Sequence, residues 1–223
     1  MEVIRTITAI FFSERCPYCD ALVEPCEIAC PACYDKLQRK HLAIKGGAMG
    51  FRCVSSFVYD GKVRRMVLRL KYHDRIQYIP QITDILAKDI IDTYGENTFD
   101  LITAVPMHPR DLKKRGYNQS QLLAKALGKS LGIPYHDTIR KIKRTKKQHK
   151  LKYRERKTNL NGAFELIDKE LIKDKSILII DDIVTSGFTL GKCCKVLSKG
   201  KPKLICCATI ANAQHKYPES TVI

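Results

Sequence analysis

The chain has 223 residues, enough for one α/β domain with a small appendage or for two small domains. Apolar residues make up 44% of it, which is ordinary for a protein with a buried core. Forty basic residues face twenty-three acidic ones, and the net charge of +17 favours a polyanionic partner: nucleic acid, an anionic membrane or a phosphorylated ligand. On charge alone, a generally basic surface without such a partner is an equal alternative.

The N-terminal region and the cysteine content together predict a reducing, cytoplasmic location. The apolar stretch from Val3 to Phe12 is interrupted by Arg5 and is followed by no small-residue cleavage site, so we expect no export. No segment reaches the roughly 20 apolar residues that span a bilayer, and we expect no stable membrane insertion. In the cytosol, the ten cysteines are expected to be metal ligands, buried side chains or catalytic groups rather than disulfides.

Two C-x-x-C knuckles lie near the N-terminus, ten residues apart. Their cysteines are Cys16, Cys19, Cys30 and Cys33. Each knuckle places two thiolates on one side of an ion, so two knuckles complete the tetrahedral shell of a structural Zn²⁺. Cys26 lies between them and is an alternative to Cys30 as a ligand. The other interpretation of the knuckles is two redox pairs or buried thiols. About 45 residues could not bury enough surface to fold without such a metal.

Beyond a break at Gly46, Gly47 and Gly50, strand-like and helix-like segments alternate. The predicted strands are 55–59, 99–105, 177–180 and 204–210, and helical spacing of apolar residues marks 63–70, 79–90, 123–131 and 190–197. This alternation predicts an α/β fold with a mostly parallel sheet and helices on both faces. We expect a zinc-binding domain over residues 1–48 and the α/β domain over 49–223.

The segment from Ile177 to Leu190 carries the most chemistry. A buried strand leads to Asp181 and Asp182, then to a loop with hydroxyls and a glycine, and then to a helix. Unpaired N–H groups at a helix N-terminus form an anion site, to which the loop adds Thr185, Ser186 and Thr189 as donors. Carboxylates accept hydrogen bonds from sugar hydroxyls, so a ligand with both phosphate and ribose fits. The alternative makes the two acids helix caps and 185–187 a plain turn.

The segment from Ile177 to Leu190 resembles the motif that binds 5-phosphoribosyl 1-diphosphate (PRPP) in type I phosphoribosyltransferases. The resemblance lies in a strand followed by two acids, two variable residues and Thr-Ser-Gly-x-Thr. Further segments resemble the ComF family of bacterial competence proteins: the twin C-x-x-C start, Phe57 to Gly61, Lys71-Tyr72, Ala104 to His108, Arg115 to Gln119, Gln148 with Leu151 and Arg154, and Asn159 to Phe164. These matches extend from Cys16 to about Asn212.

The resemblance implies a zinc finger on a type I phosphoribosyltransferase fold. Asp181 and Asp182 would then hold the ribose hydroxyls, and the loop of Val184, Thr185, Ser186, Gly187, Phe188 and Thr189 would surround the 5-phosphate. Phe188 replaces the small residue usual in the family, which puts the packing of that loop in question. Arg110, Lys113, Lys114 and Arg115 follow a strand end and could meet the diphosphate, which is expected to carry Mg²⁺; a solvated basic face is the alternative.

Residues 140–157 include eleven Lys or Arg among eighteen, with Glu155 as the one acid. Such like charges repel, so we expect the segment to be mobile without ligand. We predict that Lys143, Arg144, Lys146 and Lys147 bind single-stranded DNA. The rival interpretation is a hood that closes over PRPP and brings Gln148 and Arg154 to the diphosphate.

Two functions remain open at this point. One is a PRPP-binding competence protein that handles incoming single-stranded DNA in natural transformation, with other competence proteins as candidate partners. The other is an enzyme that transfers phosphoribosyl to an acceptor, for which the sequence indicates neither a catalytic residue nor the acceptor. The intact acids and loop favour PRPP binding in both cases.

Overall fold

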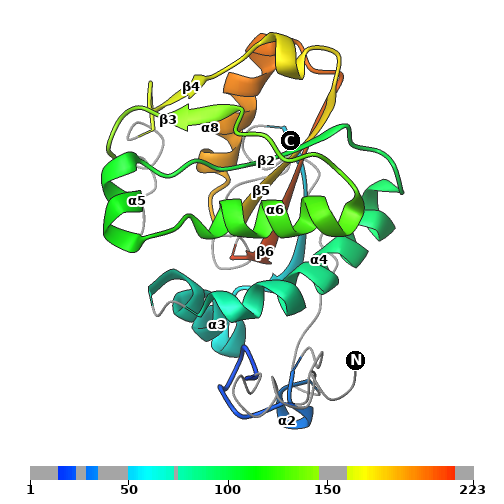
Figure 1. The fold of residues 1–223 in the computed structure, drawn as a ribbon, viewed down its shortest axis with the longest axis vertical. Coiled ribbons are helices and arrows are strands. Elements are labelled where there is room, and N and C mark those ends of the chain that lie inside the picture. The colour runs from blue at the N-terminus through cyan, green and yellow to red at the C-terminus, as the bar shows by residue number, and fades with distance from the viewer. Residues whose placement is uncertain (1–14, 24–28, 35–49, 73–74, 146–159, 214–223) are drawn as a thin grey trace, which may run out of the picture.

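The computed structural model describes residues 15–23, 29–34, 50–72, 75–145 and 160–213. Its centre is a four-stranded sheet in the order β1–β6–β5–β2, in which every pairing is parallel (Figure 1). The strands are β1 (Arg52–Val58), β2 (Leu101–Ala104), β5 (Ser176–Val184) and β6 (Leu204–Asn212). The predicted parallel α/β sheet is therefore confirmed.

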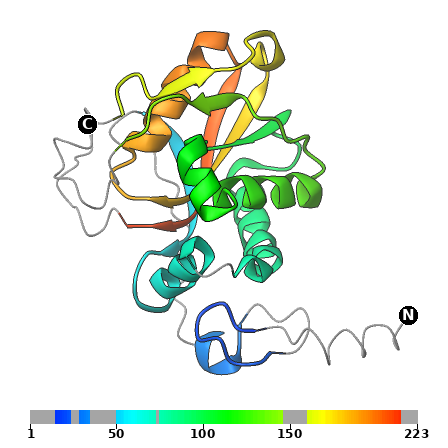
Figure 2. The same cartoon turned by 60° about the vertical axis from the view of Figure 1, so that its left-hand side comes forward.

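Helices cover one face of the sheet, and a helix with a small second sheet covers the other (Figures 1 and 2). The first layer holds α3 (Gly61–Tyr72), α4 (Ile79–Tyr94) and α6 (Gln119–Leu131). The second holds α8 (Phe188–Leu197) and the antiparallel pair β3 (Ile139–Lys141) and β4 (Phe164–Leu166). Short elements complete the described chain: α2 (Pro31–Tyr34), η1 (Ile76–Tyr78), α5 (Pro109–Arg115), η3 (Glu170–Ile172) and η4 (Ser198–Gly200).

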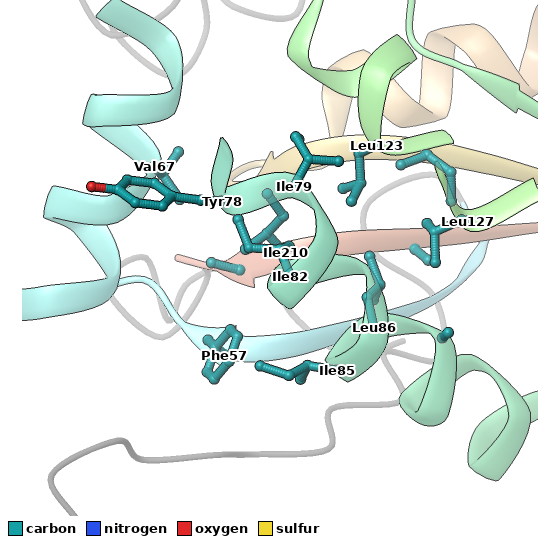
Figure 3. Packing of buried hydrophobic residues seen from close by; sticks show 14 of the residues in the cluster. Phe57, Val67, Tyr78, Ile79, Ile82, Ile85, Leu86, Leu123, Leu127 and Ile210 are labelled. Carbon is teal, nitrogen blue, oxygen red and sulfur yellow. The ribbon is translucent and has the colours of Figure 1, made fainter. Parts of the chain in front are cut away.

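Alternation along β5 explains the two layers. Leu178 and Ile180 belong to the core cluster under α3, α4 and α6, whereas Ile177 and Ile179 belong to the cluster under α8. All four side chains are fully buried, so β5 is apolar on both faces, as a central parallel strand must be. Figure 3 shows part of the first cluster, with labelled side chains from α3 (Val67), α4 (Ile79, Ile82, Ile85 and Leu86), α6 (Leu123 and Leu127), β1 (Phe57) and β6 (Ile210). Burial of each such side chain contributes roughly 1.5–3 kcal/mol.

The carboxyl ends of the parallel strands meet at one edge of the sheet. β2 leads there into α5, and β5 leads into the loop 185–187 and α8. Gln119, at the start of α6, and Lys71, at the end of α3, both reach the end of β5. This edge is therefore where side chains from distant parts of the sequence converge.

Candidate functional site

The acid pair lies within β5 rather than after it. The predicted strand end at 180 is wrong by four residues, because the backbone continues to pair with β6: Asp181 lies opposite Thr209, and Val184 lies opposite Asn212. The alternative in which the acids cap a helix is also wrong, since Gly187 is the N-cap of α8. The two carboxylates are thus held by the sheet itself.

Asp182 is buried and accepts two hydrogen bonds on the same oxygen. Its Oδ2 receives the Lys71 ammonium at 2.7 Å and the Gln119 amide nitrogen at 2.7 Å. Burial alone would lower the pKa of Lys71, but attraction to the Asp182 carboxylate outweighs it, and the pKa is raised. Lys71 therefore stays a cation at the acid pair.

Asp181 carries the opposite perturbation. Its Oδ1 accepts hydrogen bonds from Ser120 Oγ and from the backbone N–H of Asp182, both at 2.9 Å. Burial, followed by repulsion from Asp182, raises its pKa to about 7, although Lys71 and Ser120 act the other way. Asp181 is therefore about half protonated near pH 7, so the pair carries less than its full negative charge there.

The segment 115–120 positions these acids. Arg115 donates to the Gln119 amide oxygen at 2.5 Å, and Asn118 caps α6 while its amide donates to the Val105 carbonyl at 3.0 Å. The Tyr117 hydroxyl donates to the carbonyl of Leu70, which fixes the end of α3. The sequence analysis placed Arg115 at the diphosphate, and it quoted Tyr117, Asn118 and Gln119 only as part of a family pattern. It did not identify Lys71 and Ser120 as partners of the acids.

The phosphate loop has two features of an anion site. Gly187 has φ 72°, a left-handed conformation that side chains with a Cβ disfavour, and it turns the chain into α8. The Ser186 hydroxyl is buried, and its oxygen has no hydrogen-bond partner among the residues that the structure describes. A buried hydroxyl beside the N-terminus of a helix, where backbone N–H groups point toward the loop, suits a ligand oxygen.

The remaining predicted loop residues differ in their exposure. The side chains of Val184 and Phe188 are buried in the core cluster under α8, whereas Thr185 and Thr189 are half-buried. The aromatic ring of Phe188 therefore packs in the core under α8. The question that this substitution raised about the packing of the loop is answered by its burial.

The two arginines that were predicted at the diphosphate are placed differently. Arg115 lies 5.2 Å above the Tyr72 ring and joins the acid pair through Gln119. Arg110 is exposed on the first turn of α5, where its backbone N–H donates to the His108 ring. The structure thus connects Arg115 with the acid pair, whereas Arg110 lies on the exposed surface of α5.

The basic segment begins as ordered structure. Arg140 and Lys141 belong to β3, which corrects the expectation that the segment is mobile throughout. Burial lowers the pKa of Lys141, although Asp111 and Asp181 oppose this effect. Lys143 is exposed, and Arg144 pairs with Asp111 at 3.3 Å. Lys146, Lys147, Gln148 and Arg154 lie outside the described residues.

The four cysteines of the knuckles converge as predicted. All four sulfur atoms lie within 4.8 Å of one another, and Cys19 and Cys30 are 3.5 Å apart. Tetrahedral Zn–S bonds of about 2.3 Å would place the sulfurs about 3.8 Å apart, so the cluster could hold such an ion. Cys26 and the proposed domain boundary at residue 48 lie outside the described residues.

The cysteine cluster is joined to α3. Lys62, in the first turn of α3, donates to Cys33 Sγ at 3.1 Å and to the Ala32 carbonyl at 3.3 Å. The hydrogen bond to Cys33 is the main reason that the pKa of Lys62 is raised. Tyr18 packs edge-on against Phe57 of β1, with ring centroids 6.1 Å apart. One helix therefore contacts the cysteine cluster at its start and the acid pair at its end.

No helix within the described ranges is long and apolar enough to cross a bilayer.

Comparison with known proteins identifies the family. The model of the phosphoribosyl transferase domain matches residues 75–222. DNA utilization protein YhgH of Salmonella typhimurium is 32% identical over 151 residues, 66% of this chain and 65% of that protein. Competence protein F of Haemophilus influenzae is 27% identical over 139 residues, 60% and 61% of the two chains. The chain thus spans slightly under two thirds of the length of these relatives.

A solved structure, the glutamine PRPP amidotransferase of Bacillus subtilis, is similar with a TM-score of 0.43 and 14% identity, over 64% of this chain and 30% of that one. The family model covers well over half of this chain and includes the acid pair and the phosphate loop. The resemblance to the ComF family is confirmed, and the chain belongs to the phosphoribosyl transferase domain family.

Proposed function

We propose that this chain is a PRPP-binding, phosphoribosyltransferase-like competence protein that handles incoming single-stranded DNA in the cytosol. The observation that carries PRPP binding is the combination of a braced acid pair with a loop whose Ser186 hydroxyl is buried and unpaired. The acids lie near the end of β5 and the loop follows that strand directly, so one ligand can reach both. The names of the relatives, competence and DNA utilization proteins, support the role in DNA handling.

Each of the two carboxylates contacts the protein through one oxygen and would contact the ligand through the other. Asp182 uses Oδ2 and Asp181 uses Oδ1 for the contacts described above. Asp182 Oδ1 and Asp181 Oδ2 take no part in these contacts, so each acid would offer one further oxygen to a ribose hydroxyl. Ser186 Oγ and the N–H groups at the start of α8 would hold the 5-phosphate. Mg²⁺ would neutralise part of the charge of the diphosphate.

Three further parts of the proposal concern the rest of the chain. Zinc in the cysteine cluster would be structural, since four protein thiolates leave no open position. Lys143 and Arg144, with Lys146 and Lys147, would hold the phosphates of a single strand, since Lys143 and Arg144 are exposed on the basic segment beside the site. Residues 1–48 and 49–223 would form the zinc-binding and phosphoribosyltransferase-type domains.

Phosphoribosyl transfer to an acceptor is the second candidate function. One observation favours it: with a pKa of about 7, Asp181 can take a proton near neutral pH. A general base poised in this way would serve an acceptor with an ionisable N–H. The identity of the acceptor would then decide the reaction.

Calorimetry with PRPP tests the proposal directly. The protein should bind PRPP, and Ser186→Ala should weaken binding roughly tenfold, because it removes one hydroxyl donor to a charged phosphate. Release of diphosphate in the presence of candidate acceptors would separate the enzyme from the binding protein. If neither PRPP nor ribose 5-phosphate binds, the proposed ligand is wrong.

A further inference from the structure

We infer that Lys71 is the cation of the acid pair, and that the pair recognises the hydroxyls of its ligand without a divalent metal ion on either carboxylate. The inference rests on the proposed function, because it takes a ribose phosphate as the ligand. It assigns to Lys71 the place that a metal ion would occupy at such acids. Any Mg²⁺ that arrives with PRPP would then remain on the diphosphate.

Lys71 is fixed where it lies. Its neighbour Leu70 is fully buried, and the carbonyl of Leu70 accepts a hydrogen bond from the Tyr117 hydroxyl. The Lys71 side chain is 20% exposed, and its ammonium lies 2.7 Å from Asp182. The position of the Lys71 ammonium next to the acids is therefore set by the fold at the end of α3. Lys71 is not a mobile surface side chain that pairs with the acids only transiently.

The orientation of the Gln119 amide follows from its other partner. Arg115 can only donate, so the Gln119 oxygen must face Arg115 and the NH₂ group must face Asp182. Asp182 Oδ2 thus receives two donors, one of them charged, and Asp181 Oδ1 receives two more. Half of the carboxylate oxygens are already used by the protein.

A divalent cation would bind only weakly to the two remaining carboxylate oxygens. Mg²⁺ demands near-octahedral oxygen ligands and ionised carboxylates. Here the Asp182 carboxylate already pairs with the Lys71 ammonium, which would lie close to a metal ion on the other oxygen of that carboxylate and repel it. Partial protonation of Asp181 near neutral pH reduces the negative charge of the pair further. Hydroxyls of a sugar, which are neutral donors, meet no such repulsion.

The first experiment uses the wild-type protein and ribose 5-phosphate, which has no diphosphate to carry a metal. Calorimetry is done first in buffer that has been freed of divalent cations by a chelating resin before the protein is added, so that zinc held by the cysteine cluster would stay in place. It is then repeated in saturating Mg²⁺. The two dissociation constants should agree within about twofold. A dissociation constant that falls tenfold or more when Mg²⁺ is added would overturn the inference.

The second experiment needs no sugar ligand and therefore stands even if the proposed function fails. Mn²⁺ binding is measured by electron paramagnetic resonance in wild type, Lys71→Met and Lys71→Arg. Lys71→Met should gain a Mn²⁺ site that Asp182→Asn abolishes in the double variant, whereas wild type and Lys71→Arg should show none. If the wild-type protein binds Mn²⁺ and Asp182→Asn abolishes this binding, the role of Lys71 is refuted. Failure of ribose 5-phosphate to bind under any condition, with this Mn²⁺ pattern intact, would refute the ligand alone.

Discussion

Asp181 and Asp182 are neighbours in one strand, yet their neutralisation should change stability in opposite directions. Asp181→Asn keeps an oxygen for the Ser120 hydroxyl and the Asp182 N–H, and removes a charge that burial disfavours. Asp182→Asn removes the counter-ion of Lys71. The first variant should therefore be more stable than wild type near pH 8, and the second should be less stable.

The magnitude for Asp181 follows from its pKa, which rises from 3.8 to about 7 on folding. Since the folded-state pKa is the higher one, the stabilisation by the bound proton is fully present below pH 3.8 and is lost as the pH rises to 7. Between pH 5 and pH 8 the wild type should lose about 3 kcal/mol through this group, as an upper limit. Asp181→Asn cannot ionise, so its advantage over wild type should grow by up to that amount across the same range.

Asp182→Asn should cost about 2–3 kcal/mol. Breaking a buried ion pair typically costs about 3–5 kcal/mol, and partial exposure of the Lys71 side chain reduces this. Urea denaturation followed by circular dichroism at pH 5 and pH 8 measures both effects, since the chain has no Trp for fluorescence. Both variants should lose affinity for PRPP. If Asp181→Asn is destabilising at pH 8, or if its difference from wild type does not change with pH, the assignment of the charge at this site is wrong.

Three further predictions concern the zinc cluster, the phosphate loop and the basic segment. Elemental analysis should find about one zinc per chain, and a metal-free chain with this region folded would contradict the zinc site. Cys30→Ser should lower the zinc content. It should also lower the affinity for PRPP, because Lys62 joins the cysteine cluster to the helix that carries Lys71. Gly187→Val should abolish PRPP binding in calorimetry while the domain stays folded, since a branched side chain is strained at φ 72° and blocks the approach of the phosphate; unchanged affinity would exclude this loop. Replacement of the four predicted DNA-binding residues by Glu should abolish binding of single-stranded DNA; these residues are Lys143, Arg144, Lys146 and Lys147. The affinity of the wild-type protein for single-stranded DNA should fall as salt is added, with a log–log slope of roughly −0.7 per phosphate contacted. The matched control places Glu at four lysines exposed elsewhere, Lys88, Lys129, Lys195 and Lys199, with the same change in net charge; equal loss in both variants would show that net charge, and not this segment, binds the strand.

The sequence by itself determined the features that depend on local spacing. Apolar periodicity indicated the strands and helices around the sheet, and two C-x-x-C pairs predicted a cluster whose sulfurs do converge. The order of acids, hydroxyls and glycine located the candidate ligand site at the end of β5. Each of these signals is contained within a few residues, because it reflects backbone geometry or the reach of one turn.

Only the tertiary structure decided which polar groups surround the acids. Asp182 contacts Gln119, 63 residues earlier, and Asp181 contacts Ser120, 61 residues earlier. The strand runs through both acids, which are poor strand formers, because ladder hydrogen bonds to β6 continue to Asn212. Lys71 reaches Asp182 because α3 and β5 end at the same edge of the sheet. Apolar spacing reveals which face of an element is buried, but it contains no information about which distant side chains meet at that edge.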